Sequence, residues 1–111
     1  MAVTMPDESL RALNAAVQDV WHERMRQVKK WGEQHHPDLV MADVRQDFVE
    51  LAELWKKRNG DATADWTGIL LEEVFEALAE PESSAELEAE LIQVAAVAAA
   101  WVEDIRSRRA G

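Results

Sequence analysis

Four glutamates in the second half of the chain have the spacing of one shared helix face: Glu72, Glu73, Glu76 and Glu80. On a helix they fall within an arc of about 100°, where like charges repel by a few tenths of a kcal/mol per pair. No lysine or arginine is interleaved to relieve this repulsion, and Glu73 borders the apolar face that contains Ile69 and Leu70. The pattern is typical either of a solvated acidic face or of a site that binds a cation.

A further carboxylate lies within an apolar stripe later in the chain. Glu90 has Leu87, Val94 and Val97 at positions −3, +4 and +7, and Gln93 lies beside it on the same side. A carboxylate in apolar surroundings costs several kcal/mol unless a hydrogen-bond donor or a cation meets it. The partner of Glu90 is therefore expected to be an arginine, a proton or a metal ion.

Arg24 is the arginine best placed for that role, because Val20 and Val28 lie one helical turn before and after it. It is expected either to form a core salt bridge with Glu73 or Glu90, or to hold a phosphate with its planar guanidinium. One arginine does not neutralise three or more converging carboxylates, whereas a hard divalent cation does. Mg²⁺ prefers a few carboxylates together with water and phosphate oxygens, so we expect Mg²⁺, with Mn²⁺ as an alternative.

Hydrophobic periodicity predicts four helices, and the expected fold class is all-α. The expected helices span about residues 7–31, 39–58 and 66–79, and from the segment 83–86 to about residue 108. Asn59-Gly60 is expected to end the second helix, and Asp65 is the expected N-cap of the third. The segment 83–86, Ser-Ser-Ala-Glu, has the form of a capping box. These elements predict a single domain over residues 1–111.

Two apolar stripes are expected to be buried against the other helices. They comprise Leu10, Leu13, Val17, Val20, Trp21, Val28 and Trp31 in the first helix, and Val40, Val44, Phe48, Leu51 and Trp55 in the second. The fourth helix is apolar on all sides, since Gln93 is its only polar residue between Leu91 and Val102. Three companion helices do not suffice to cover it, so we expect a second copy of the chain to complete the bundle.

Charge and composition exclude several classes of function. The 111 residues have a net charge of −10, and residues 61–105 contain twelve acids and no base. A protein that coats nucleic acid would carry the opposite sign. The longest apolar run has nine residues (94–102), far short of the roughly 20 that span a bilayer. We therefore expect a cytoplasmic protein with no nucleic-acid polymer and no membrane as partner.

The acidic motifs resemble those of the MazG-like all-α nucleoside triphosphate pyrophosphohydrolases. The segment 72–76, Glu-Glu-Val-Phe-Glu, matches the EExxE motif of that family, and 90–93, Glu-Leu-Ile-Gln, lies where the family has ExxD. The segments KWGEQHHP (30–37) and ELIQVAAVAAAW (90–101) also resemble a compact, single-domain, often phage-associated branch. The resemblance covers most of residues 20–105 and implies a four-helix MazG-like bundle completed by oligomerisation.

The resemblance also implies an activity and roles for individual residues. Members of the family cleave nucleoside triphosphates to a monophosphate and pyrophosphate, and they form homodimers or dimers of dimers. Glu73, Glu76 and Glu90 would hold Mg²⁺, and Glu72 would join them or assist the attacking water. The metal would bridge phosphate oxygens and lower the pKa of that water. Gln93 replaces the aspartate of ExxD, and it would bind through its amide oxygen and weaken the Mg²⁺ affinity.

The substrate-binding residues are expected near the first connection. Arg24 and Lys30 are the candidates for holding phosphates, and Gln34 is the candidate for reading the edge of a base. Trp31 either packs as the end of the apolar stripe or stacks on the nucleobase. The leading interpretation is a homo-oligomeric, Mg²⁺-dependent nucleoside triphosphate pyrophosphohydrolase. The alternatives are a nucleotide- or metal-binding module without efficient catalysis, and a structural helical protein whose acidic face binds a basic partner.

Overall fold

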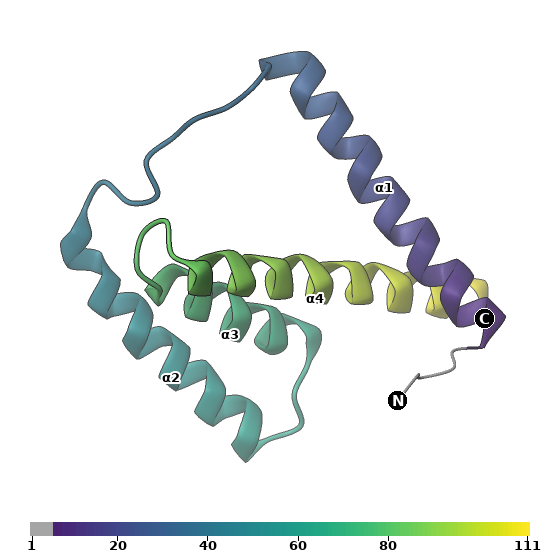
Figure 1. Cartoon of the computed structure of the whole chain (residues 1–111). Helices are drawn as coiled ribbons and strands as arrows, with labels where there is room; N and C mark the ends of the chain where they lie inside the picture. Colours follow the sequence, from purple (N-terminus) through teal and green to yellow (C-terminus); the bar gives the residue numbers. More distant parts are fainter. Residues whose placement is uncertain (1–5) are drawn as a thin grey trace. The chain divides into compact units, whose positions relative to one another are not determined.

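The computed structural model describes residues 6–111, and within this range every regular element is helical. The helices are α1 (Asp7–Trp31), the short 3₁₀ helix η1 (Ala42–Val44), α2 (Arg45–Asp61), α3 (Trp66–Ala79) and α4 (Ala85–Ala110) (Figure 1). The prediction of an all-α fold with four α-helices is confirmed. None of the helices in the described range has the length and apolar character needed to cross a membrane.

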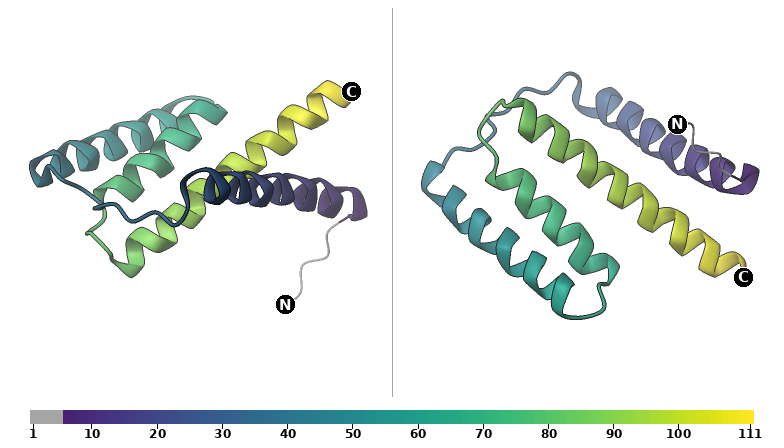
Figure 2. Two further views of the ribbon diagram at one scale, coloured as in Figure 1. Left: turned by 90° about the horizontal axis from the view of Figure 1, so that it is seen from above. Right: turned by 60° about the horizontal axis from the view of Figure 1, so that its bottom comes forward.

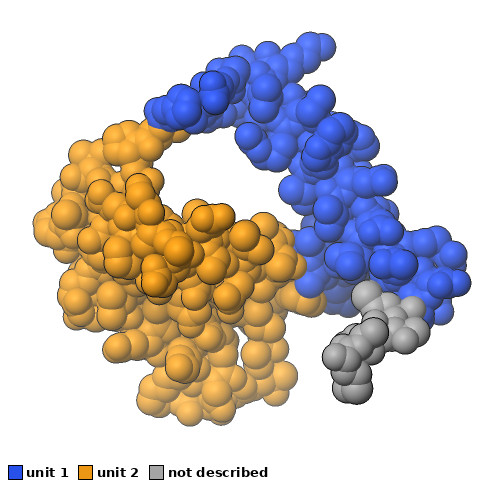
Figure 3. All heavy atoms as spheres, viewed as in Figure 1, with its two compact units in different colours: residues 1–35, 99–111 blue, residues 36–98 orange. Residues whose placement is uncertain are grey.

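Two compact units make up the chain (Figure 3). One unit comprises Met1–His35 and Ala99–Gly111, and the other comprises His36–Ala98. The first therefore holds α1 with the last part of α4, where Arg106 donates a hydrogen bond to Asp19 over 2.5 Å. The second holds α2, α3 and the first part of α4, and it contains all the glutamates of the predicted motifs.

Side-chain caps explain where α3 and α4 begin. Asp65 precedes α3 in an extended conformation, and its Oδ1 accepts a hydrogen bond from the Gly68 backbone over 2.7 Å, as predicted for an N-cap. At α4 the cap is Ser84, whose Oγ accepts from the Leu87 backbone over 3.0 Å. The N-cap is therefore one residue later than predicted, and the predicted capping box does not form, because Leu87 takes the place of its glutamate. Ser83 instead adopts a positive φ of 54° and donates its backbone N–H to Asp38.

Helix α2 differs from its prediction at both ends. It begins at Arg45 rather than near residue 39, because the 3₁₀ turn of η1 precedes it and Val40 lies outside it, 84% exposed. It also continues through Asn59-Gly60 to Asp61, whose carboxylate accepts a hydrogen bond from Lys57 over 2.6 Å in the last turn. Turn-forming residue types therefore did not end the helix where the sequence predicted.

Helices α2 and α3 pack against each other in the second unit (Figure 2). Phe48 of α2 stacks on Phe75 of α3, with their ring centroids 6.3 Å apart and their planes inclined by 18°. Ala77, two residues further along α3, is almost completely buried. The aromatic pair accounts for a bulky residue within the acidic motif, since Phe75 holds the two helices together.

The predicted burial of the first stripe is wrong for the single chain. Trp21 and Trp31 are each 58% exposed, and Val17 is 50% exposed. Among residues 6–111 the buried hydrophobic side chains are three alanines, Ala16, Ala77 and Ala99. The apolar periodicity therefore identified a face of α1 whose large side chains are exposed.

The Asp65 cap gives a direct test of the fold. Replacing Asp65 by alanine removes the acceptor for the Gly68 amide, and we expect the free energy of unfolding to fall by about 1 kcal/mol. Asp65→Asn keeps a capping oxygen and should retain most of the stability. Urea denaturation of the two variants measures the difference, and equal losses in both would contradict the capping role.

Candidate functional site

Three carboxylates of the predicted EExxE motif converge on α3. One oxygen from each of Glu72, Glu73 and Glu76 lies within 4.8 Å of the others, and all three side chains are half-buried. Their positions follow from helix geometry, since residues three and four apart lie on the same face. Carboxylate oxygens at this separation are close enough to coordinate one hard cation together.

Glu90 of α4 belongs to the same electrostatic environment. The pKa of Glu73 is raised, first by burial and then by the negative charges of Glu90 and Glu72. The pKa of Glu76 is raised to about 7 by burial and by the charges of Glu73, Glu72 and Glu90, with a hydrogen bond to Glu72 acting in the same direction. The carboxylates of the two predicted motifs therefore repel one another across the helix pair.

Two of these carboxylates each have a buried oxygen that lacks a hydrogen-bond partner. Within the described range, Glu73 Oε2 and Glu90 Oε2 are shielded from solvent and accept no hydrogen bond. An ionised oxygen in this state is costly, because it has lost water without gaining a donor. A proton or a cation would satisfy each of these oxygens. Both are among the three partners that the sequence predicts for Glu90.

Asn59 of α2 orients the remaining carboxylate. Its Nδ2 donates to Glu72 Oε1 over 2.8 Å and to the Gly68 carbonyl over 3.0 Å. Gly68 is buried, and a Cβ there would collide with Asn59 Oδ1. The glycine therefore makes room for the asparagine that fixes Glu72. Sequence reasoning treated Asn59 only as a helix stop and missed this role.

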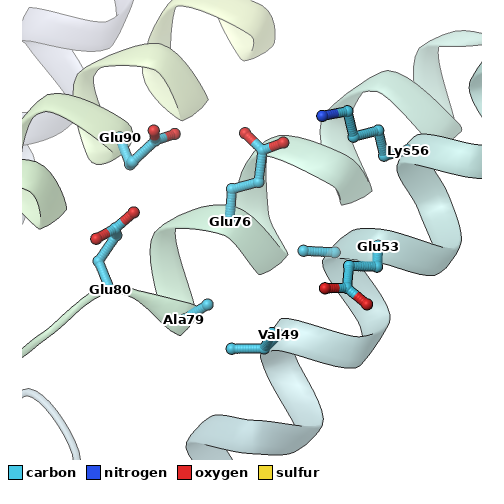
Figure 4. A pocket seen from close by; sticks show the side chains of 8 residues that line it. Val49, Glu53, Lys56, Glu76, Ala79, Glu80 and Glu90 are labelled. Atoms are coloured by element: carbon cyan, nitrogen blue, oxygen red, sulfur yellow. The ribbon is translucent and has the colours of Figure 1, made fainter.

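A cavity of about 270 Å³ opens beside the cluster (Figure 4). Its lining comes from α2, α3 and the first part of α4: Val49, Ala52, Glu53, Lys56, Glu76, Ala79, Glu80 and Glu90. Figure 4 shows Glu76 and Glu90 directed into the same space, with Glu80 beside them at the end of α3. Glu76 and Glu90 therefore connect the carboxylate cluster to the cavity.

Lys56 is the basic residue in the lining of this cavity, and the sequence analysis did not select it. Figure 4 shows its amine extending from α2 on the side of Glu76. The phosphate contacts predicted from the sequence, Arg24 and Lys30, both lie on α1 rather than on α2. The signal was present, because Lys56 lies three residues after Glu53 and seven after Val49, on one helix face.

The predicted substrate-binding residues lie in the first unit. Arg24 donates to Gln27 over 2.7 Å and lines an apolar cavity with Val20 and Val102. The Lys30 amine lies 4.9 Å from the centroid of the Trp31 ring, at the exposed end of α1. Gln34 is exposed in the connection. These four residues belong to the first unit and the carboxylates belong to the second, and the roles of the four stay predictions.

Gln93 also stays a prediction as a metal ligand. Its side chain is exposed on α4, one turn after Glu90, and Gln93 is not among the residues that line the cavity. The site that the structure assembles is therefore made by Glu72, Glu73, Glu76 and Glu90, with Asn59 as the orienting residue.

Comparisons with known proteins leave the family of the chain open. No family model, no curated protein and no solved structure matches it. The MazG-like resemblance therefore remains a prediction from residue patterns, and a functional proposal depends on the chemistry of the site itself.

The raised pKa of Glu76 predicts how stability varies with pH. The folded protein binds protons more tightly than the unfolded chain between the ordinary pKa of 4.5 and about 7. Stability therefore falls as pH rises through this window. Without divalent ions, Glu76→Gln should be more stable than wild type at pH 8 and similar to it at pH 4. Chemical denaturation at several pH values measures the difference.

Glu50→Gln is the matched control, because Glu50 is an exposed glutamate of α2 outside the cluster. We expect its denaturation midpoint to follow wild type across the pH range. If the two variants behave alike, the assigned repulsion at Glu76 is wrong.

Proposed function

We propose that the chain is an Mg²⁺-dependent nucleoside triphosphate pyrophosphohydrolase whose site is formed by carboxylates of α3 and α4. The observation that carries the proposal is the pair of buried oxygens without hydrogen-bond partners, Glu73 Oε2 and Glu90 Oε2. They come from two helices and belong to one repelling cluster. A purely solvated acidic face would not place carboxylate oxygens out of reach of water.

These donors fit a hard divalent cation. Glu73, Glu76 and Glu90 would hold Mg²⁺ or Mn²⁺, because oxygen ligands and a high local negative charge are what such ions prefer. Gln93 is a further candidate ligand through its amide oxygen. When bound, the ion supplies positive charge for the phosphate oxygens of the substrate.

The residues of the chain itself suggest how hydrolysis proceeds. Asn59 fixes one oxygen of Glu72, so that this carboxylate is oriented to accept a proton from the attacking water. The water oxygen bonds to the α-phosphorus, and the bond from that phosphorus to the pyrophosphate oxygen breaks. The products are a nucleoside monophosphate and pyrophosphate, with the proton of the water held first by Glu72.

Lys56 is the proposed contact for the substrate phosphates in the acidic cavity. A lone ammonium among Glu53, Glu76 and Glu80 compensates part of the negative charge that a triphosphate would meet there. Arg24, Lys30, Trp31 and Gln34 remain proposed contacts for the outer phosphates and the base.

The fold proposal is a MazG-like bundle that a second copy completes as a homodimer or a dimer of dimers. Leu91 and Ile92 of α4 are 51% and 64% exposed, as expected if the single chain lacks cover for this helix. A helix that is apolar on all sides gains stability only when every side is covered.

The decisive experiment measures pyrophosphate release from a panel of canonical and modified nucleoside triphosphates with Mg²⁺ or Mn²⁺. We expect turnover with at least one substrate, and a decrease of more than about 100-fold in Glu73→Ala and Glu76→Ala. Circular dichroism verifies that both variants keep their helices, and Glu50→Ala serves as the matched control.

Thermal melting with the metal and a non-hydrolysable nucleotide separates the alternatives. Stabilisation by this nucleotide, together with no pyrophosphate release from any hydrolysable triphosphate of the panel, would favour a nucleotide-binding module, in agreement with the exposed Gln93 at the ExxD position. A melting temperature that does not change with EDTA, Mg²⁺ or nucleotide would contradict both the enzymatic function and the nucleotide-binding function.

Lys56 allows a sharper test of the phosphate contact. Lys56→Ala should raise KM about tenfold, since a lost hydrogen bond to a charged group costs roughly 1.5 kcal/mol or more. Lys57→Ala is the matched control, because Lys57 is bonded to Asp61 and is not part of the cavity lining. Steady-state kinetics of the two variants decides the question, and equal KM values would exclude Lys56.

A further inference from the structure

The loop between α3 and α4 determines where Glu90 lies relative to the carboxylates of α3. Residues 80–84 join the two helices, and the chain reverses its direction between them (Figure 2). Glu76 of α3 and Glu90 of α4 line the same cavity, and both are directed into it (Figure 4). A change in the conformation of this loop would therefore separate the carboxylates of the two helices.

Ser83 holds the loop in a conformation that is unfavourable by itself. Its φ is 54°, in the left-handed region that residues with a Cβ rarely adopt. The next residue, Ser84, is the N-cap of α4, so the conformation of Ser83 sets the direction in which α4 begins. This conformation therefore needs a contact that stabilises it.

Asp38 supplies such a contact from the connection that precedes η1. Its Oδ2 accepts a hydrogen bond from the Ser83 backbone N–H over 2.6 Å, and the Ser83 hydroxyl lies 3.4 Å from the same oxygen. A hydrogen bond to an ionised carboxylate is about twice as strong as one between neutral groups. Asp38 and Ser83 both belong to the second unit, so their contact is part of the fold of that unit.

A second contact to the loop is weaker. Arg45, at the start of α2, donates to Glu82 Oε1 over 3.5 Å, which is at the outer limit of a hydrogen bond, and the Glu82 side chain is 49% exposed. A surface ion pair with this geometry contributes little to stability. Asp38 is therefore the stronger anchor of the loop.

The anchor acts against the repulsion among the carboxylates. Glu73 and Glu90 each have a buried oxygen without a hydrogen-bond partner, and their negative charges repel each other. In the absence of a cation, this repulsion favours any motion of α4 that takes Glu90 away from α3. The loop is the point about which α4 would move, and the contact from Asp38 restrains it.

We propose that Asp38 is a positioning residue for the carboxylate site: by holding Ser83 in its left-handed conformation, it keeps Glu90 close to Glu76. The inference rests on the proposed function for its effect on metal binding and turnover. The effect on the position of α4 is measurable without either.

Spin labels test the position of α4 without any metal, because the chain contains no cysteine of its own. Thr67→Cys near the start of α3 and Ala96→Cys on α4 are exposed positions. Both lie far from the loop along their helices, where an opening of the two helices moves the labels most. We expect Asp38→Ala to lengthen and broaden the distance distribution between the labels in pulsed EPR. Asp38→Asn retains an acceptor oxygen and should preserve the distribution of the wild-type background.

Substitutions of Ser83 test the same contact from its other side. Ser83→Gly keeps the backbone N–H and tolerates the positive φ, whereas Ser83→Pro loses both. We therefore expect the distance between the labels to lengthen in Ser83→Pro and to stay unchanged in Ser83→Gly. Asp43→Ala is the matched control for Asp38→Ala, because it removes an exposed aspartate of the neighbouring η1. Circular dichroism verifies that the variants keep their helices.

Manganese binding measures the consequence for the site. Asp38→Ala should raise the Mn²⁺ dissociation constant about tenfold, which is typical when a residue that orients a metal ligand is removed. At saturating Mg²⁺, kcat of Asp38→Ala should approach the wild-type value, because the bound ion draws Glu90 back towards Glu76. A variant that lost activity by unfolding would not recover in this way.

The possible failures are distinguishable. A label distance that both Asp38→Ala and Ser83→Pro leave unchanged overturns the positioning role, whatever the chain binds. A longer distance with an unchanged Mn²⁺ dissociation constant overturns the role of Asp38 at the site. A longer distance in Asp38→Ala, together with a wild-type chain that binds no Mn²⁺, supports the positioning of Glu90 by Asp38 and overturns the proposed function.

Discussion

The repulsion among half-buried carboxylates around Glu73 is the constraint on which the site depends. Burial and neighbouring negative charges raise the pKa values of Glu73 and Glu76 together, so the folded chain holds these groups where their ionisation is disfavoured. This arrangement lowers the stability of the folded chain. A bound cation would turn the repulsion among the carboxylates into attraction between each carboxylate and the ion. The same charges that destabilise the empty cluster would give it affinity for a metal ion.

The packing of α2 on α3 prevents the cluster from relaxing. The Phe48–Phe75 stack joins the two helices at the level of the acidic motif, and Asn59 bonds to both Glu72 and the Gly68 carbonyl. Rotation of α3 to expose its glutamates would break these contacts. Electrostatic strain at the carboxylates is therefore balanced by apolar packing and by one asparagine, and α2 acts as the positioning element of the site.

Much of the second unit could be predicted from local signals. The limits of α3 follow from the Asp65 cap and from the Pro81 that comes after its end, and the convergence of Glu72, Glu73 and Glu76 follows from helical periodicity. The role of Asn59 could not be predicted in this way, because it depends on a contact between residues thirteen positions apart. Lys56 was visible on its helix face, but only the packing of α2 identifies which face borders the cavity.

The apolar faces show a different limit of sequence reasoning. Periodicity identified the α1 residues that need cover, yet Trp21 and its neighbours are exposed in the single chain. A hydrophobic pattern reports that a face is unfavourable in water, and it carries no information about which chain supplies the cover. The buried hydrophobic side chains within residues 6–111 are three alanines, and alanines alone bury little apolar area. With so small a core, we expect the free energy of unfolding to rise with any contact that covers the exposed apolar side chains.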